Sequence, residues 1–191
     1  MASFIGDGCV SILESFEFDN VREMVDLERV EALLKTTDGI TSPKRIKLSN
    51  KSFSKEAALA LSQVISGFNE IKTADLSYII AGRPEMEALI TLSTICGSLV
   101  ENNLVSVNLS DNALGKKGVH ACKDVLVGGK LEVSSIDLEK AHITHSTLLV
   151  NLNIHADTVL VQQRTIVGGM RIRLFLVTRI SVPESSNSSF L

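Results

Sequence analysis

The chain has 191 residues, of which 45% are hydrophobic and only 4% aromatic, with no tryptophan and a formal net charge of -3. This hydrophobic fraction excludes disorder throughout, and the scarcity of aromatic residues leaves leucine, isoleucine, valine and alanine to fill the core. The basic residues are scattered and aromatic stacking platforms are few, so we expect no nucleic-acid partner.

The N-terminal segment, residues 1–42, is acidic, with nine Asp and Glu residues against three Lys and Arg. Within it, residues 25–37 (VDLERVEALLKTT) have the spacing of an amphipathic helix, which we expect to cap the repeats that follow. No basic stretch precedes an apolar run at the N-terminus and no apolar run is long enough to span a membrane, so the sequence predicts a cytoplasmic protein. Three cysteines without CxxC spacing fit reduced, buried thiols: Cys9, Cys96 and Cys122.

A short pattern occurs four times in the middle of the chain, as RIKLSN, TADLSY, VSVNLSDN and SSIDLEK. Its anchoring leucines are 28, 33 and 29 residues apart, which is the period of long leucine-rich repeats. The anchors are Leu48, Leu76, Leu109 and Leu138.

Each unit reads as a strand followed by a helix. Apolar and polar residues alternate before the anchor, and helical spacing of apolar residues follows it over 57–65 and 119–126. In three units an apolar residue five positions after the anchor marks the return of the chain to the core: Phe53, Leu114 and Ile143. The sequence therefore predicts an α/β leucine-rich-repeat solenoid, a horseshoe of about four strand-helix units over residues 43–150.

The second unit is about five residues longer than its neighbours, and we expect the extra length directly after the strand, in 79–89 (IIAGRPEMEAL). Insertions in solenoids usually map to loops on one face, often the binding face. Pro84 suits the first turn of the next helix, with Glu85 and Glu87 near its positive end. Arg83 would then lie at the rim, free to reach a partner, although a solvated loop arginine is the alternative.

Three segments together, KRIKLSNKSFSKEAALAL, DLSYIIAGRPEMEAL and LVSVNLSDNALGKKGVHA, resemble the opening repeats of the Ran GTPase-activating proteins, in particular the plant-type branch. The resemblance runs from about residue 25 to 131. It implies an activator without an active site of its own, which binds the GTP form of the small GTPase Ran through the rim of the horseshoe and acts in nucleocytoplasmic transport. It also adds the nuclear periphery as a second location.

Carried over position by position, the resemblance matches Arg83 to the family's loop arginine, and Asp111 and Asn112 to the SDN loop of the next repeat. In the fourth unit Lys140 and its neighbours stand where the family has an asparagine-bearing loop, and no repeat follows residue 150. The candidate contacts with the GTPase are Arg83, Glu85, Asp111, Asn112 and Lys140.

Three interpretations stay open at this point. The first is an active GTPase activator, which the Arg83 loop favours. The second is a non-catalytic leucine-rich-repeat scaffold for protein-protein interaction, which the missing asparagine favours. The third is a chain with too few repeats to fold stably.

The tail, residues 151–191, does not continue the repeat. Two β-prone runs around Gly168 and Gly169 fit either a hairpin that covers the open end or a segment unrelated to the family, and the last residues fit disorder. His142 and His145 lack further ligands nearby, so we expect no metal site. No phosphate-binding motif or nucleophile arrangement is present, so we expect no cofactor and no enzyme chemistry.

Overall fold

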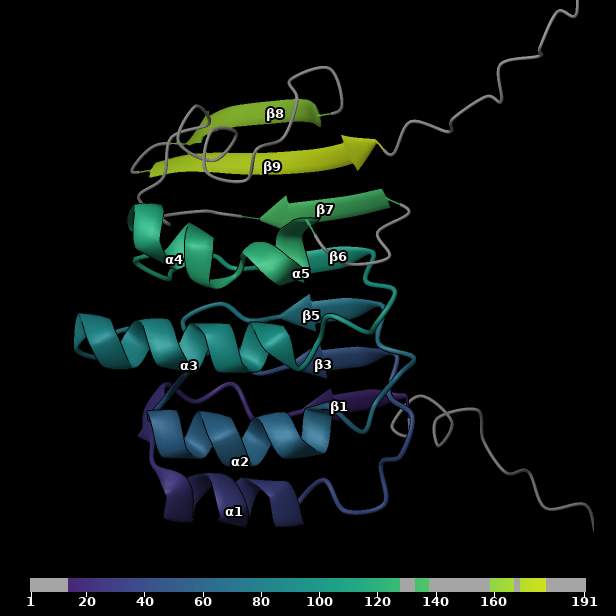
Figure 1. The fold of residues 1–191 in the computed structure, drawn as a ribbon, viewed down its shortest axis with the longest axis vertical. Coiled ribbons are helices and arrows are strands. Elements are labelled where there is room, and N and C mark those ends of the chain that lie inside the picture. Colours follow the sequence, from purple (N-terminus) through teal and green to yellow (C-terminus); the bar gives the residue numbers. More distant parts are fainter. Residues whose placement is uncertain (1–13, 128–132, 138–158, 167–168, 178–191) are drawn as a thin grey trace, which may run out of the picture.

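A computed structural model of the chain describes residues 14–127, 133–137, 159–166 and 169–177. Within these residues the main sheet has the strand order β1-β3-β5-β6-β7-β9-β8 (Figure 1). The first five of these strands pair in parallel. They are β1 (Ser15–Glu17), β3 (Arg45–Lys47), β5 (Thr73–Asp75), β6 (Ser106–Asn108) and β7 (Val133–Asp137).

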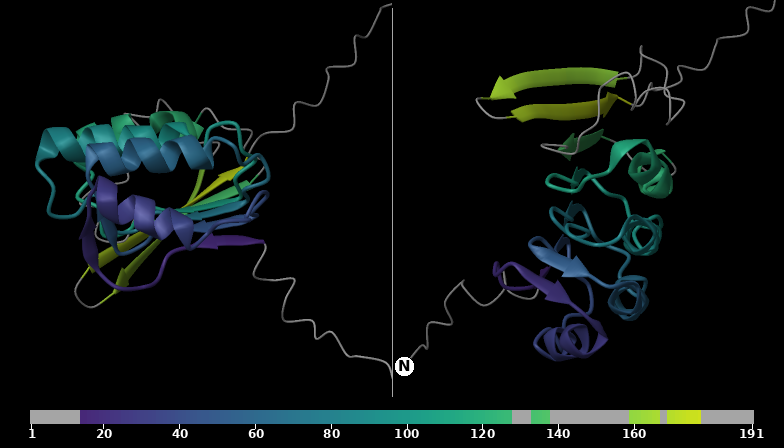
Figure 2. Two further views of the ribbon diagram at one scale, coloured as in Figure 1. Left: turned by 90° about the horizontal axis from the view of Figure 1, so that it is seen from below. Right: turned by 90° about the vertical axis from the view of Figure 1, so that its left-hand side faces the viewer.

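The helices form one layer beside these strands (Figure 2). Helices α1 to α4 each follow a strand in the chain, α5 follows α4 directly, and α1 to α4 pack in order against one another. The alternation of parallel strands and helices predicted from the sequence is confirmed. The helices are α1 (Leu27–Lys35), α2 (Lys55–Ile65), α3 (Glu85–Gly97), α4 (Gly115–Ala121) and α5 (Lys123–Val127).

The core lies between the two layers. The anchoring residues Leu48, Leu76 and Leu109 are fully buried. The side chains predicted to return the chain to the core are buried too, with Phe53 fully enclosed and Leu114 4% exposed. Burial of a leucine side chain contributes about 2 kcal/mol, so these repeated positions supply much of the driving force. The remaining predicted core positions, Leu138 and Ile143, lie outside the described residues.

Helices α1 and α2 begin at side chains that accept backbone hydrogen bonds. Asp26 accepts from the N–H of Arg29 at the start of α1, and Ser54 accepts from the N–H of Ala57 at the start of α2. Such caps satisfy N–H groups that have no partner within the helix. Helix α3 follows Pro84, which makes no side-chain cap. Glu85 and Glu87 lie in its first turn, where negative charge is stabilising because the N-terminal end of a helix carries partial positive charge.

The extra length of the second unit is not confined to the loop after the strand. Nine residues (76–84) connect β5 to α3, against seven (48–54) between β3 and α2. Helix α3 has 13 residues and α2 has 11, and eight residues (98–105) lead from α3 to β6 against seven (66–72) from α2 to β5. The added residues therefore divide between the loop, the helix and the segment that returns to the next strand. The expectation that all of them lie directly after the strand is wrong in this respect.

A buried asparagine joins two units on the side where the chain returns from helix to strand. The Asn102 Oδ1 accepts the N–H of Ile71 at 2.9 Å, and its Nδ2 donates to the carbonyl of Phe68 at 3.1 Å. Because both backbone groups belong to the preceding unit, Asn102 holds that unit's return segment against its own.

The acidic N-terminal segment adds two strands that the sequence did not predict. β1 extends the main sheet beside β3, and β2 (Glu23–Val25) pairs in parallel with β4 (Lys51–Phe53) in a small second sheet. The side chain of Lys51 is fully buried, and its Nζ donates to Asp19, to the carbonyl of Val21 and to Glu23. This lysine therefore fastens the segment to the first repeat.

The C-terminal part of the sheet is formed by β8 (Val159–Ile166) and β9 (Gly169–Val177), which pair antiparallel, with β9 also antiparallel to β7. The domain boundaries predicted at residues 42 and 150 stay predictions. In the described part of the chain, no helix combines the length and apolar character required to cross a membrane.

Acid pH should weaken the attachment of the N-terminal segment. The hydrogen bond from Lys51 lowers the pKa of Asp19 below its ordinary 3.8, and the hydrogen bond from Arg29, aided by Lys51, lowers the pKa of Glu23 below 4.5. A carboxylate with a depressed pKa stabilises the fold above its unfolded-state value, and this contribution is lost as the pH falls through the folded-state value.

We therefore expect Lys51→Met to lower the thermal midpoint at pH 7, because it leaves Asp19 and Glu23 without this cation. The difference in thermal midpoint between the variant and the wild type should shrink as the pH falls below about 4. The two carboxylates are protonated first in the variant, which lacks the cation, and at lower pH in the wild type. Melting curves recorded by circular dichroism from pH 7 to pH 3 check this. An equal difference at every pH would contradict the role of the two acids.

Candidate protein-binding loops

Three loops follow successive parallel strands and therefore lie at one edge of the sheet. They comprise residues 48–54, 76–84 and 109–114, and we call them the loop edge. Backbone hydrogen bonds continue between them beyond the strands: the N–H of Asn50 donates to the carbonyl of Ser77, and the N–H of Tyr78 to that of Ser110, each at 3.1 Å. The loops are thus held in the same register as the strands.

The same left-handed backbone turn occurs in each of the three loops. Asn50, Tyr78 and Asp111 have φ angles of 64°, 63° and 57°, and each is the second residue after an anchoring leucine. Asparagine and aspartate tolerate this conformation, whereas for tyrosine it costs about 1–2 kcal/mol. The guanidinium of Arg22 lies 4.4 Å from the centroid of the Tyr78 ring, a cation-π contact that helps to offset this cost.

Asn112 is buried and works within the loop edge rather than on its surface. Its Oδ1 accepts the N–H of Ile80 at 3.2 Å, and its Nδ2 donates to the carbonyls of Leu76 at 2.8 Å and Leu109 at 3.0 Å. Leu76 and Ile80 belong to the preceding loop, so one amide ties two loops together. The structure thus places this candidate contact residue in the interior, between the 76–84 and 109–114 loops.

Arg83 folds back onto the chain instead of reaching outwards. Its side chain is only 12% exposed, and its Nη2 donates to the carbonyls of Ser52 at 2.6 Å and Val25 at 3.1 Å. Its Nη1 lies 3.4 Å from the Oε1 of Glu87, one helical turn on. The guanidinium therefore joins the 76–84 loop to the end of β2 and to the middle of β4.

This geometry corrects the expectation that Arg83 is free at the rim. The alternative of a solvated loop arginine is not what the structure shows either, because the guanidinium is mostly enclosed. The Nε of Arg83 is buried and has no hydrogen-bond partner among the described residues. A buried donor of this kind costs about 1–3 kcal/mol, so the contacts of the two Nη atoms must be strong enough to hold the arrangement.

A groove of about 520 Å³ opens beside the Arg83 loop. Its lining comes from the loop, from the first turn of α3 and from the first turn of α4. Glu85 is exposed at this place and pairs with the Nζ of Lys117 at 2.5 Å, with both side chains more than half exposed. An exposed pair of this kind contributes about 0.2–1 kcal/mol, so a partner can replace either member at little cost.

The structure brings together four of the five candidate residues. Arg83 and Glu85 flank Pro84 at the start of α3, while Asp111 and Asn112 lie in the adjacent loop. Lys140 lies outside the described residues. Sequence reasoning missed Arg22, Asn50 and Tyr78, which meet on the same edge, where the Nε of Arg22 donates to the Oδ1 of Asn50 at 3.2 Å. The sequence signal that could have found Asn50 and Tyr78 is their position directly after the repeated Leu-Ser pair.

The charged groups of this edge differ in their exposure. The carboxylate of Glu85 is open to solvent, whereas the guanidinium of Arg83 and the carbonyls of Ser52 and Val25 are paired with one another. The described residues contain no group of three or more His, Cys, Asp or Glu side chains arranged for a metal ion. The histidines considered from the sequence, His142 and His145, lie outside those residues.

The described part of the chain is thus an α/β protein in which parallel strands of one sheet alternate with helices on one side, with a braced loop edge. No protein-family model matches the chain. Over 102 residues it is 39% identical to RAN GTPase-activating protein 1 of Arabidopsis thaliana, covering 52% of this chain and 19% of the relative. Over 122 residues it is 38% identical to RAN GTPase-activating protein 2 of the same plant, covering 61% and 22%.

The chain is therefore a relative of the plant Ran GTPase-activating proteins, as the sequence motifs predicted. The homology covers between about half and three fifths of this chain. The chain spans about a fifth of the length of these two curated relatives.

We expect Asn112→Ala to destabilise the chain by about 2–4 kcal/mol, because it leaves a buried N–H and two buried carbonyls without their partner. Asn103→Ala is the matched control, since Asn103 is exposed on the opposite edge of the sheet. Urea unfolding of both variants against the wild type measures the difference. A loss below about 0.5 kcal/mol for Asn112→Ala would contradict its role as a tie between loops.

Proposed function

We propose that this chain is a leucine-rich-repeat segment that binds the small GTPase Ran in its GTP form and stimulates hydrolysis through the loop edge. The observation that carries the proposal is the braced Arg83 loop within a stretch homologous to two proteins named as Ran GTPase activators. The proposal includes the horseshoe form of residues 43–150, the acidic cap of residues 1–42 and the separate tail of residues 151–191. It also includes a cytoplasmic location, with the nuclear periphery as the alternative.

In this proposal Arg83 acts by positioning. Its hydrogen bonds to Ser52 and Val25 fix the loop that carries Glu85 at the mouth of the 520 Å³ groove. Glu85 is the exposed carboxylate that a cationic side chain of the partner can reach by displacing Lys117. The chain would thus contribute binding and orientation, while the GTPase supplies the reacting groups.

The adjacent loop contributes in the same way. Asn112 fixes its backbone from within, and Asp111, two residues after the anchoring leucine, holds the left-handed turn at its tip. Lys140 is the proposed contact in the following unit. Together these residues would form a surface that crosses three neighbouring units, which is how solenoid proteins enlarge their contacts.

A non-catalytic scaffold is the second candidate function. Two observations favour it: the guanidinium of Arg83 is occupied by the chain's own carbonyls, and Lys140 stands where the resemblance places an asparagine. In that case the loop edge would bind the GTPase or another protein without changing the rate of hydrolysis.

Single-turnover hydrolysis of GTP by Ran, with and without the chain, separates the two functions. We expect acceleration by the wild type, a loss of about 10-fold or more with Arg83→Ala, and a smaller loss with Glu85→Ala, because the first change releases the whole loop. Partial recovery with Arg83→Lys is not expected, since a lysine has one terminal nitrogen and cannot contact Glu87 while it donates to the carbonyls of Ser52 and Val25, as the two Nη atoms of the guanidinium do.

The control is Glu101→Ala, which removes an exposed carboxylate on the opposite edge of the sheet. It should leave the acceleration unchanged. If the well-folded wild type binds Ran-GTP without accelerating hydrolysis, the scaffold function holds and the activator function is rejected. If it neither binds nor accelerates, the activator function is rejected, and so is the scaffold function with Ran as the partner.

A further inference from the structure

A second groove lies on the outer side of the helix layer, between α3 and α4. It has a volume of about 750 Å³. Its apolar floor comes from α3, where Met86 is 72% exposed and Ile90 is 45% exposed, with Leu89 beside them. Two large apolar side chains this open to water, side by side on one helix, mark a surface that gains free energy when it is covered.

The groove lies beside the first half of α3. Its lining residues on α3 fall within 86–93, and those on α4 fall within 116–121. Helix α3 has 13 residues, whereas α4 has seven and ends at Ala121, after which the chain continues into the five-residue α5. Helix α4 therefore forms the second edge of the groove and leaves the apolar side chains of α3 open on the outer side.

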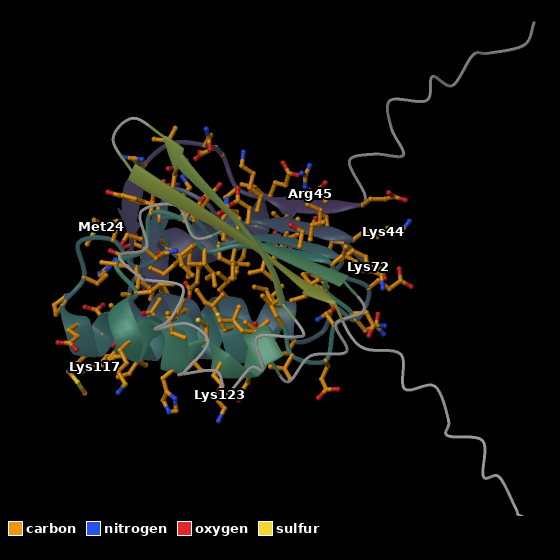
Figure 3. The ribbon with its side chains drawn as sticks, turned by 90° about the horizontal axis from the view of Figure 1, so that it is seen from above. Met24, Lys44, Arg45, Lys72, Lys117 and Lys123 are labelled. Atoms are coloured by element: carbon orange, nitrogen blue, oxygen red, sulfur yellow. The ribbon has the colours of Figure 1, made fainter. Side chains whose placement is uncertain are left out.

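The edge of the groove formed by α4 is cationic. Lys116, Lys117 and His120 line it, and all three are exposed. Figure 3 shows Lys117 and Lys123 on the outer side of the helix layer, away from the strands. Glu85 offsets the charge of Lys117, which leaves Lys116 as the cation of this edge without an ion pair among the described residues.

We propose that this groove binds an amphipathic helix of a partner protein, with apolar side chains on Met86, Leu89 and Ile90 and carboxylates facing Lys116 and Lys117. An apolar floor with charge along one edge is the arrangement that accepts a helix whose apolar stripe is flanked by charge of the opposite sign. The carboxylates fix the orientation of the helix and exclude basic helices, and the apolar contact supplies most of the affinity.

This binding site goes beyond the proposed function, because it lies on the helix layer and needs no nucleotide. It is contiguous with the groove beside the Arg83 loop, since Leu89, Lys116 and Lys117 line both. A helix in the outer groove would therefore end close to the loop edge without covering Arg83.

The test uses the full chain and two stapled synthetic helices with the same leucine stripe, one flanked by glutamates and the other by lysines. Fluorescence anisotropy should show that the glutamate helix binds and that raising the salt concentration weakens it. We expect Ile90→Lys and Lys116→Glu each to weaken binding about tenfold or more. Lys116→Glu should also improve binding of the lysine helix, which a merely structural role of Lys116 would not produce.

The matched control is Leu59→Lys, which places the same charge on an exposed apolar position of α2 outside the groove, 57% exposed against 45% for Ile90. It should leave the affinity unchanged, and circular dichroism verifies that all variants are folded. The proposal is overturned if the wild type does not bind the glutamate helix, if it binds both helices equally, or if Leu59→Lys weakens binding as much as Ile90→Lys.

Discussion

In the described part of the chain, neighbouring strand-helix units pack against one another, strand beside strand and helix beside helix, and this contact governs the rest of the structure. The backbone hydrogen bonds between neighbouring strands continue into the loops that follow them, and Asn102 and Asn112 tie the two ends of neighbouring units together. The N-terminal end is closed by α1 and by the strands β1 and β2, with Lys51 buried as the fastener between them and the first repeat.

The loop edge inherits its shape from the stack. Because β3, β5 and β6 pair in register, their loops start side by side at one edge of the sheet. Each loop makes its left-handed turn at the second residue after the anchoring leucine. The second loop is the longest of the three and is the one held by Arg83. An arginine that joins its loop to two neighbouring segments can make a surface rigid before a partner arrives, which reduces the entropy lost on binding.

Sequence reasoning predicted the alternation of strands and helices and most of the buried positions, because leucine spacing reports burial directly. It placed the longest unit second but assigned all of the extra length to 79–89, a stretch that spans the end of the loop and the start of α3. The roles of Arg83 and Asn112 could not be predicted, because their partners, Val25, Ser52 and Leu76, lie 31 to 58 residues away in the chain. The pairing of β1 with β3 was missed for the same reason.

Amide hydrogen exchange of the 76–84 loop tests the central claim, that Arg83 braces the loop edge from within, most directly. The account predicts that in Arg83→Ala the N–H groups of Ile80 and Arg83, which donate to Asn112 and to the carbonyl of Ile80, exchange much faster than in the wild type. Amides of α2 should keep their protection. Unchanged exchange in the loop of the variant would contradict the account, because it would show that the loop holds its shape without the arginine.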